Sequence, residues 1–336
     1  MPKHIPSEAV SALFKNYPIT CLDVGGRGGV QNFFLPYLDL IQIDAFEPDV
    51  AACEDAQKSA PAHVNFFPVA LGKHTQTVPF YLTNRASGAS LYEPNPAMMY
   101  RYSNEAYGGI NKVLDMDVMS YSDFRAKYDR PHANIVKIDT QGSELDILQS
   151  FAQEDFKEVV CVLAEVEFVD MYKNQPLFHD IDSYMQANEF TLFDLRTARC
   201  YLTKDQDRDH YLKKLGYGTG TNRISGFMMA GDALYFRRFE DNCPKDQKTF
   251  VQLLLSYLMF LYFDHAFELL ENGLKYNVID QDQYNQLEEY VGSITPKPRL
   301  TERKGPIFDL LRRVLRRLGL YGPYQAFWQE RNWPHQ

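Results

Sequence analysis

Short apolar runs alternate with helical or loop stretches through the first two thirds of the chain. The runs are rich in β-branched and aromatic residues, and several of them end at a glycine or a proline. This alternation is typical of a mostly parallel sheet covered by helices, and the stretch from Ser143 to Phe151 is expected to be one crossover helix. The predicted strands are Ile19 to Val24, Leu40 to Phe46, His63 to Leu71, Asn134 to Ile138, Val159 to Glu165, Phe190 to Leu195 and Ala233 to Arg237.

Two neighbouring segments depart from this alternation. Val78 to Leu82 is strand-like but follows its predecessor too closely for a helical crossover, so an extra or edge strand is expected. Thr83 to Gly109 is loop-like and includes Ser87 to Ser90 and four tyrosines. A stretch of this length without regular structure is usually functional or disordered, and its aromatic residues favour order. These tyrosines either line a ligand pocket or pack the loop onto the sheet.

The composition changes after Asp241, where the pattern becomes helical. The longest apolar run, Val251 to Phe263, would reach about 20 Å as a helix, which is short of the roughly 30 Å of a bilayer core. It therefore predicts a buried helix. We expect one domain over residues 1–240 and a helical extension over residues 241–336. The predicted helices of the extension are Gln247 to Asn272, Gln281 to Val291 and a short amphipathic helix from Ile307 to Leu318.

The net charge of −9 argues against a nucleic-acid partner, because polyanion binding needs a basic surface. Only residues 301–336 are locally basic, with seven Lys or Arg against three Asp or Glu. The five cysteines are scattered without Cys-x-x-Cys spacing, and the first residues carry no secretory signal. These features argue against a zinc site or a disulfide framework and favour a reducing, cytoplasmic location.

A glycine-rich turn, Asp23-Val24-Gly25-Gly26-Arg27-Gly28-Gly29, follows the first predicted strand. Glycines let the backbone approach a ligand, and a helix that starts there offers its N-terminus to an anion. Glu47 ends the second predicted strand, where a carboxylate can accept hydrogen bonds from ribose hydroxyls. A plain tight turn is the alternative, but the pair predicts a nucleotide-like cofactor. The spacing Gly25-x-x-Gly28 differs from the three-glycine dinucleotide fingerprint and favours a methyltransferase over an NAD enzyme.

Further motifs along residues 19–240 extend this pattern, and together they resemble the FkbM-type methyltransferase family in the family's order. Leu163 to Val166 and Gly231 to Arg237 resemble its later strands. The motifs that resemble the family are Asp23-Val24-Gly25-Gly26, Phe46-Glu47-Pro48-Asp49, Val69-Ala70-Leu71-Gly72, Ala89-Ser90-Leu91 and the long block Val136 to Leu148, with Lys137-Ile138-Asp139 and Gly142-Ser143-Glu144.

The resemblance implies a class I methyltransferase fold, which is Rossmann-like with a mostly parallel seven-stranded sheet, and S-adenosylmethionine as the cofactor. The chain departs from the family's usual Ala-Asn at Gly26 and Arg27. Arg27 either contacts the methionine carboxylate of the cofactor or points to solvent, and solvent is the favoured orientation. The residues expected to bind the cofactor are Asp23, Gly25, Gly26, Arg27, Gly28, Glu47, Ala70, Leu71, Asp139 and Gln141.

The candidate catalytic residues follow from the rule that ligands bind at the carboxyl ends of parallel strands. Methyl transfer is an in-line displacement that depends on alignment, and a hydroxyl acceptor benefits from a base that takes its proton. Asp139 is the first candidate, Glu165 the second and the loop residue His210 a third. Asp139 can instead cap a helix or contact the cofactor amine, and a loop histidine is more often solvated. No spacing of His, Asp and Glu calls for a metal.

The reaction implied by the resemblance is O-methylation of a sugar or glycan precursor. A polyketide, lipid or other small-metabolite acceptor is the enzymatic alternative. A catalytically silent interaction module is the non-enzymatic alternative. The amphipathic helix at residues 307–318 has arginines beside its apolar face. Such a helix can lie on an anionic membrane or dock on its own domain or on a second subunit of a homo-oligomer.

Overall fold

The computed structural model describes residues 6–25, 29–102, 109–200, 214 and 227–295. Contacts divide the chain into two compact units. The sheet unit comprises Tyr17–Val30 and Leu38–Asn242, and the helical unit comprises Met1–Asn16, Gln31–Tyr37 and Cys243–Gln336. The expected split into residues 1–240 and 241–336 stays a prediction.

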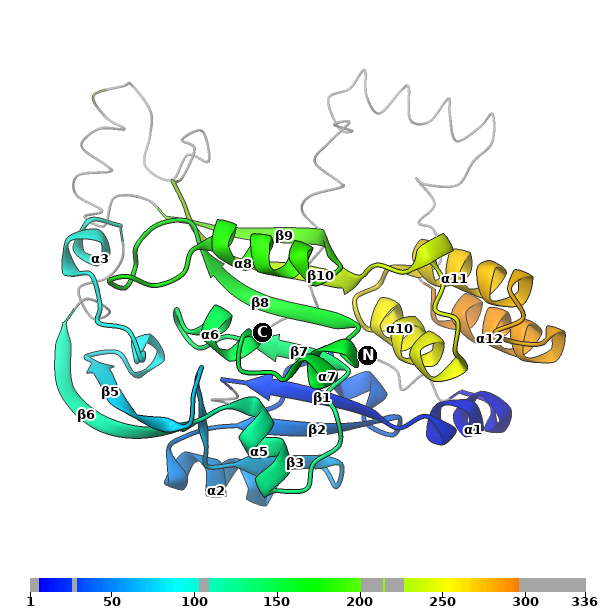
Figure 1. The fold of residues 1–336 in the computed structure, drawn as a ribbon, viewed down its shortest axis with the longest axis horizontal. Helices are drawn as coiled ribbons and strands as arrows, with labels where there is room; N and C mark the ends of the chain where they lie inside the picture. Colours follow the sequence, from blue (N-terminus) through cyan, green and yellow to red (C-terminus); the bar gives the residue numbers. More distant parts are fainter. Residues whose placement is uncertain (1–5, 26–28, 103–108, 201–213, 215–226, 296–336) are drawn as a thin grey trace. The chain divides into compact units, whose positions relative to one another are not determined.

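A seven-stranded sheet in the order β3-β2-β1-β7-β8-β10-β9 forms the centre of the sheet unit (Figure 1). Neighbours from β3 to β8 are parallel, whereas β10 is antiparallel to both β8 and β9. Every residue of β1 and β7 is buried, as expected for central strands of a parallel sheet that is covered on both faces. The strands are β1 (Ile19–Val24), β2 (Ile41–Phe46), β3 (Val64–Phe67), β7 (Ile135–Ile138), β8 (Cys161–Glu167), β9 (Phe190–Cys200) and β10 (Phe227–Arg237).

The order of the strands reverses between β1 and β7, because β2 and β3 extend from one side of β1 and β7 and β8 from the other. This is a topological switch point, where the loops after the two strands diverge and leave a crevice. The expected fold class, a mostly parallel seven-stranded sheet with flanking helices and a helical C-terminal extension, is confirmed.

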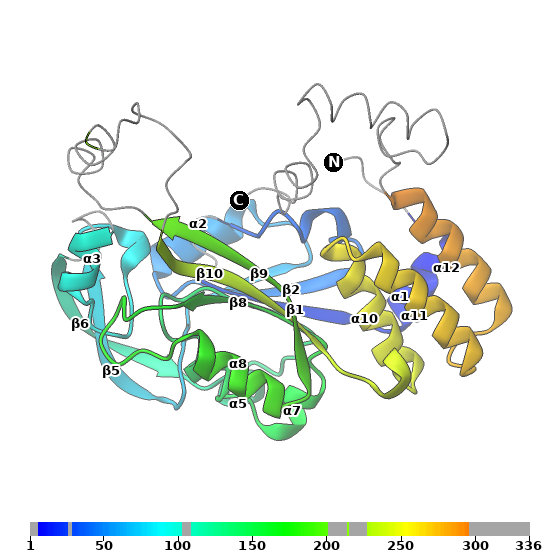
Figure 2. The same ribbon diagram turned by 90° about the horizontal axis from the view of Figure 1, so that it is seen from above.

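Helices cover both faces of this sheet, with α5, α7 and α8 on one face and α2 on the other (Figure 2). The apolar core beneath α5 to α8 joins Val136 and Val162 of the sheet to Phe124, Leu148 and Ile181 of the helices. Asp49 begins α2 by accepting hydrogen bonds from two backbone N–H groups of the first turn. The helices are α2 (Val50–Ser59), α5 (Tyr121–Lys127), α6 (Glu144–Leu148), α7 (Gln153–Lys157) and α8 (Phe178–Ala187).

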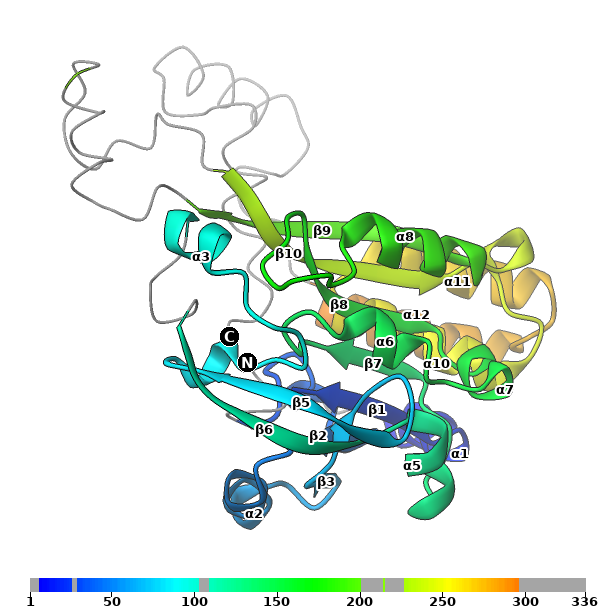
Figure 3. The same cartoon turned by 60° about the vertical axis from the view of Figure 1, so that its left-hand side comes forward.

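A second sheet of three strands, in the order β4-β6-β5, belongs to the same unit (Figure 3). It consists of β4 (Ala70–Leu71), β5 (Gln76–Thr83) and β6 (Ile110–Met119). The extra strand expected at Val78 to Leu82 is thus β5. The loop-like interpretation of Thr83 to Gly109 is wrong over Pro96–Tyr102, which forms α3. Proline suits the first helical position, since its missing N–H has no partner there in any case.

The helical unit contains α1 (Glu8–Asn16), α10 (Gln247–Met259), α11 (Phe263–Lys275) and α12 (Gln281–Ile294). The single helix expected from Gln247 to Asn272 is wrong, because Leu261 adopts a left-handed conformation with a φ of +66° and separates α10 from α11. The apolar part of α10 is fully buried, as predicted. The predicted helix at residues 307–318 lies outside the described residues. Across the described ranges, no helix is both long and apolar enough to cross a membrane.

The structure describes the side chains of four of the five cysteines, and all four are buried. Cys21, Cys53 and Cys161 belong to the sheet unit and Cys243 to the helical unit. Burial raises the pKa of the Cys21 and Cys161 thiols well above the usual range, and nearby acidic groups add to the shift in Cys21. These thiols therefore act as small apolar groups in the core.

Candidate functional site

A cavity of about 280 Å³ lies in the sheet unit at the carboxyl ends of β1, β2 and β7. Its position is the switch point at which open α/β sheets bind ligands. Polar groups come from Glu47, Asp139 and Gln141. Apolar wall is provided by Phe46, Val69, Leu71, Phe80 and Leu91, and the segment Ala86 to Ala89 contributes small side chains. The cavity thus combines an apolar wall with a few polar groups, as sites for small molecules do.

Gly25, directly after β1, lines the cavity and also lies close to the backbone of Asp139 at the end of β7. Its φ is +86°, and a Cβ placed on it would lie 1.9 Å from the backbone oxygen of Asp139. The amide of Asp139 in turn donates to the backbone oxygen of Val24 at 3.0 Å. Only glycine fits here, because both the backbone conformation and the space exclude a side chain.

Glu47 ends β2, and its side chain is held by the turn that follows. One carboxylate oxygen accepts a hydrogen bond from the Asp49 amide at 2.9 Å, and the residue is only 6% exposed. A carboxylate anchored in this way at the end of the second strand can accept hydrogen bonds from the hydroxyls of a ribose.

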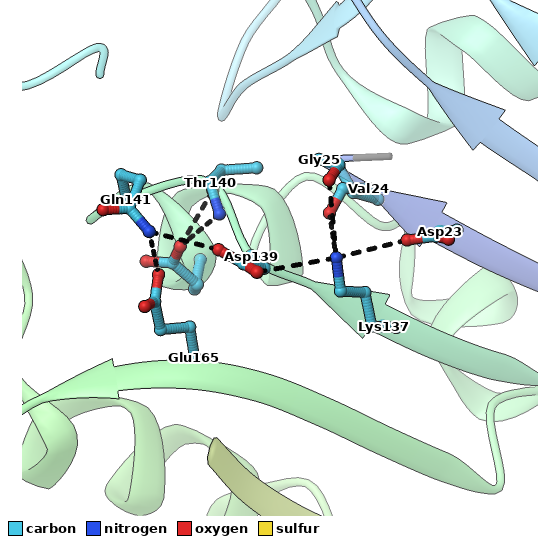
Figure 4. Close-up of polar contacts among 9 residues, drawn as sticks. Asp23, Val24, Gly25, Lys137, Asp139, Thr140, Gln141 and Glu165 are labelled. Atoms are coloured by element: carbon cyan, nitrogen blue, oxygen red, sulfur yellow. Dashed lines mark hydrogen bonds and ion pairs between the residues drawn. The ribbon is translucent and has the colours of Figure 1, made fainter. Parts of the chain in front are cut away.

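Lys137 places a buried ammonium group between two carboxylates (Figure 4). Its Nζ is 3.2 Å from Oδ1 of Asp23 and 3.7 Å from Oδ2 of Asp139, and 3.5 Å from the backbone oxygens of Val24 and Gly25. Burial alone would lower the pKa of Lys137, but the charges of Asp23 and Asp139 outweigh burial and raise it. Lys137 therefore stays cationic and neutralises part of the negative charge beneath the cavity.

Gln141 joins Asp139 to Glu165 on the other side of the site (Figure 4). Its Nε2 donates to Oδ1 of Asp139 at 3.2 Å and to Oε2 of Glu165 at 2.5 Å. Burial, with the charge of Asp139 adding to it, raises the pKa of Glu165 well above its ordinary value. Burial likewise raises the pKa of Glu167, two residues further along β8. The side chains of Glu165 and Glu167 are thus enclosed by protein, whereas the Asp139 side chain is 34% exposed on the cavity wall.

Six of the expected cofactor ligands lie on the cavity wall, namely Gly25, Glu47, Ala70, Leu71, Asp139 and Gln141. Asp23 is fully buried beneath the wall against Lys137, and Glu165 reaches the site through Gln141. Gly26, Arg27, Gly28 and His210 lie outside the described residues. Within the described ranges, no group of three or more His, Cys, Asp or Glu side chains is arranged to hold a metal ion.

Sequence reasoning missed the partners that hold this wall in place. Tyr172 donates its hydroxyl hydrogen to Oε1 of Gln141 at 3.1 Å, from a segment for which no local pattern predicts a role. Glu144, in the first turn of α6, is a second such partner. Its carboxylate accepts hydrogen bonds from the amides of Thr140 and Gly142, at 2.7 and 2.9 Å.

The strand order with one antiparallel strand, the glycine turn after β1 and the acidic end of β2 define a class I methyltransferase domain. Residues 23–192, just over half of the chain, match the family model of the methyltransferase FkbM domain. The chain belongs to this family and is a methyltransferase that depends on S-adenosylmethionine. Its residues fit this cofactor, since Glu47 suits the ribose and the apolar wall suits an adenine ring.

Several solved structures are similar to this chain. One is a protein of the NADB-Rossmann superfamily from Streptococcus agalactiae, with 12% identity over 86% of this chain and 96% of that one, and a TM-score of 0.30. A TehB-like SAM-dependent methyltransferase from Corynebacterium glutamicum has 7% identity over 68% and 87%, with a TM-score of 0.29. Magnesium protoporphyrin IX methyltransferase from Synechocystis has 11% identity over 69% and 77%, with a TM-score of 0.27. Among curated protein sequences, none matches the chain significantly.

Proposed function

We propose that the protein is an O-methyltransferase that transfers a methyl group to a hydroxyl of a sugar or glycan precursor. The observation that carries the proposal is the Asp139 carboxylate, which is 34% exposed on the cavity wall between Lys137 and Gln141. A carboxylate in this position can accept the proton that an aliphatic hydroxyl loses as it is methylated.

The cofactor supplies an electrophilic methyl group on a sulfonium. In the proposed mechanism Glu47 binds the ribose hydroxyls and the turn at Gly25 receives the methionine end. Asp139 orients the acceptor hydroxyl and takes its proton, while the Lys137 ammonium lies 3.7 Å from the Asp139 carboxylate on the side of β7. Alignment of the two reactants supplies the rest of the rate enhancement. Glu165 and His210 are the alternative candidates for the base.

A sugar acceptor is supported by the tyrosines of the segment that follows β5. Tyr92 holds this segment on α6 through a 2.7 Å hydrogen bond to Asp146, and Tyr100 exposes 49% of its surface. Exposed tyrosine rings stack well on sugar rings. Neither Tyr92 nor Tyr100 lines the cavity itself, so this support concerns the segment around it. The acceptor class otherwise follows from the family resemblance, and a polyketide, lipid or other small metabolite is the alternative.

Calorimetry with S-adenosylhomocysteine tests the cofactor half of the proposal. Glu47→Ala removes an acceptor of ribose hydrogen bonds, so its affinity is expected to fall by about 10-fold to 100-fold, as for charged hydrogen bonds worth 1.5–3 kcal/mol. Glu54→Ala, an exposed acid on α2, is the matched control and should bind like the wild type. Absence of binding, or binding that Glu47→Ala leaves unchanged, would contradict the proposal.

Release of S-adenosylhomocysteine in the presence of candidate acceptors tests the acceptor half. Turnover is expected with sugar nucleotides or glycan fragments, and Asp139→Asn should lower kcat by about 100-fold or more, the usual contribution of a general base. Turnover with polyketide or lipid hydroxyls alone would reassign the acceptor. Cofactor binding without turnover on any acceptor class would favour the catalytically silent interaction module.

We further propose that residues 1–240 form the catalytic domain and that residues 241–336 are a helical extension of a cytoplasmic protein without a nucleic-acid partner.

The basic helix at residues 307–318 is proposed to contact an anionic membrane, with docking on the same chain or on a second copy in a homo-oligomer as the alternative. Flotation with anionic liposomes at low and high salt tests this. Binding that survives deletion of residues 301–336 would contradict the membrane contact.

A further inference from the structure

The turn after β7 has a backbone conformation that residues other than glycine rarely adopt. Gln141 has a φ of +61° and Gly142 a φ of +108°. A left-handed conformation costs a residue other than glycine about 1–2 kcal/mol, so other contacts must stabilise it here. Glu144 accepts hydrogen bonds from the Thr140 amide at 2.7 Å, its hydroxyl at 3.0 Å and the Gly142 amide at 2.9 Å. Ser90 adds a 2.6 Å hydrogen bond from its hydroxyl to the backbone oxygen of Gln141.

This conformation directs the Gln141 side chain between two carboxyl groups, and its polar atoms all have partners. Both contacts of Nε2 are with carboxyl oxygens, at 3.2 Å to Asp139 and 2.5 Å to Glu165. Oε1 accepts a hydrogen bond from the Tyr172 hydroxyl at 3.1 Å. Reversing the amide would place three acceptor oxygens together, so the donor end must face the carboxyl groups.

Two neighbouring carboxyl groups repel each other when both are ionised, and repulsion would turn the more mobile one away. A carboxamide between them offers a hydrogen to each and carries no charge of its own. It also has no proton to exchange near neutral pH. Such a group can fix the direction of Asp139 without taking part in the transfer of a proton.

We propose that Gln141 is a positioning residue, whose carboxamide aims the Asp139 carboxylate at the transferring methyl group by tying it to Glu165. The hydrogen bonds from the backbone amides of Thr140 and Gly142 to Glu144 hold the turn that carries Gln141 in place. The proposal rests on the proposed function. It differs from the expectation that Gln141 binds the cofactor directly, because its donor hydrogens are directed to carboxyl groups of the protein.

Two cofactor analogues separate these roles in calorimetry on the full chain. S-Adenosylhomocysteine lacks the methyl group, whereas sinefungin replaces the sulfonium and its methyl with a carbon that carries an amino group. The cationic amine probes a carboxylate near the methyl position. In Gln141→Met, which keeps the chain length but has no hydrogen-bonding group, the preference for sinefungin should fall about fivefold or more. Affinity for S-adenosylhomocysteine should change by less than about threefold, since this analogue carries no positive charge at the methyl position.

Three further variants serve as controls for this result. Asp139→Asn should lower the preference at least as much as Gln141→Met, and Gln149→Met, an exposed glutamine after α6, should leave it unchanged. Tyr172→Phe removes the hydroxyl that lies 3.1 Å from Oε1 of Gln141 and 3.3 Å from the backbone oxygen of Gly88. It should lower the preference in the same direction by a smaller factor, and it keeps the test valid if Gln141→Met fails to fold.

An unchanged preference in both Gln141→Met and Tyr172→Phe would overturn the proposal. Equal loss of affinity for both analogues in Gln141→Met would overturn it as well and would make Gln141 a direct cofactor ligand. If Asp139→Asn lowers the preference and Gln141→Met does not, Asp139 is oriented without Gln141 and the proposed function stands. If the wild type binds neither analogue, the proposed function fails and the positioning role fails with it.

Discussion

Replacement of Lys137 by methionine keeps the length of a buried side chain and removes its charge. The Lys137 ammonium lies 3.2 Å from Asp23, whose side chain is fully buried, and the Lys137 side chain itself is only 6% exposed. Solvent therefore screens this pair very little. Removal of one partner of a buried ion pair costs about 3–5 kcal/mol, because the other charge stays buried without its counterion. We expect Lys137→Met to lower the free energy of unfolding by an amount in this range.

The double variant Lys137→Met with Asp23→Asn tests the physical reason for this loss. It removes both charges, and buried pairs replaced as a whole are often nearly neutral, so at least half of the lost stability should return. Urea unfolding at pH 7 followed by circular dichroism measures both variants. Lys58→Met, which removes an exposed ion pair with Asp55, is the control and should unfold like the wild type. A loss below about 1 kcal/mol in the single variant, or no recovery in the double variant, would refute the reasoning.

Three further variants test other parts of the sheet unit. Gly25→Ala should lose S-adenosylhomocysteine binding in calorimetry and about 2 kcal/mol or more of stability in urea, because its Cβ would collide with the Asp139 backbone oxygen; a variant that binds normally would contradict this. Arg237→Ala should lose about 3 kcal/mol, since the guanidinium donates to three backbone oxygens and stacks on Phe190, and an unchanged urea midpoint would exclude this role. Burial raises the pKa of Glu144 from 4.5 to about 7. The folded protein therefore loses stability relative to the unfolded chain as the pH rises from about 4.5 to about 7. In thermal or urea unfolding, the stability of Glu144→Gln relative to the wild type should therefore increase by up to about 3 kcal/mol from pH 4.5 to 7, and a difference that stays constant would argue against the titration of Glu144.

Strands with continuous apolar runs were predictable, whereas elements with weaker patterns were not. β1 and β7 are buried on both faces, and their sequences are apolar apart from Thr20, Asp23 and Lys137. β6 was missed, although Leu114, Met116 and Val118 alternate with acidic residues in the way of a half-buried strand. The break between α10 and α11 has no such signal, because a leucine rather than a glycine takes the left-handed conformation.

The position of the site was predictable, but the contacts that arrange it were not. The glycine turn, Glu47 and Asp139 each end a predicted strand, and parallel strands bring their carboxyl ends to one edge. The hydrogen bonds of Gln141 to Glu165 and Tyr172 join residues 24 and 31 positions apart in the sequence. Such pairings depend on the tertiary packing of β8 and the segment after it, which local patterns do not encode. The same holds for α1, which contacts α12 at the far end of the chain through Phe14 and Tyr290.

The buried cysteines make the native protein its own reporter of local opening. A thiol in the core reacts with an alkylating reagent only when the structure around it opens, so the rate of labelling measures the free energy of that opening. Cys21 and Cys161 report on the centre of the large sheet, and Cys243 reports on the helical unit. Peptide mapping after timed alkylation would therefore compare the stability of the two units within one unmodified chain.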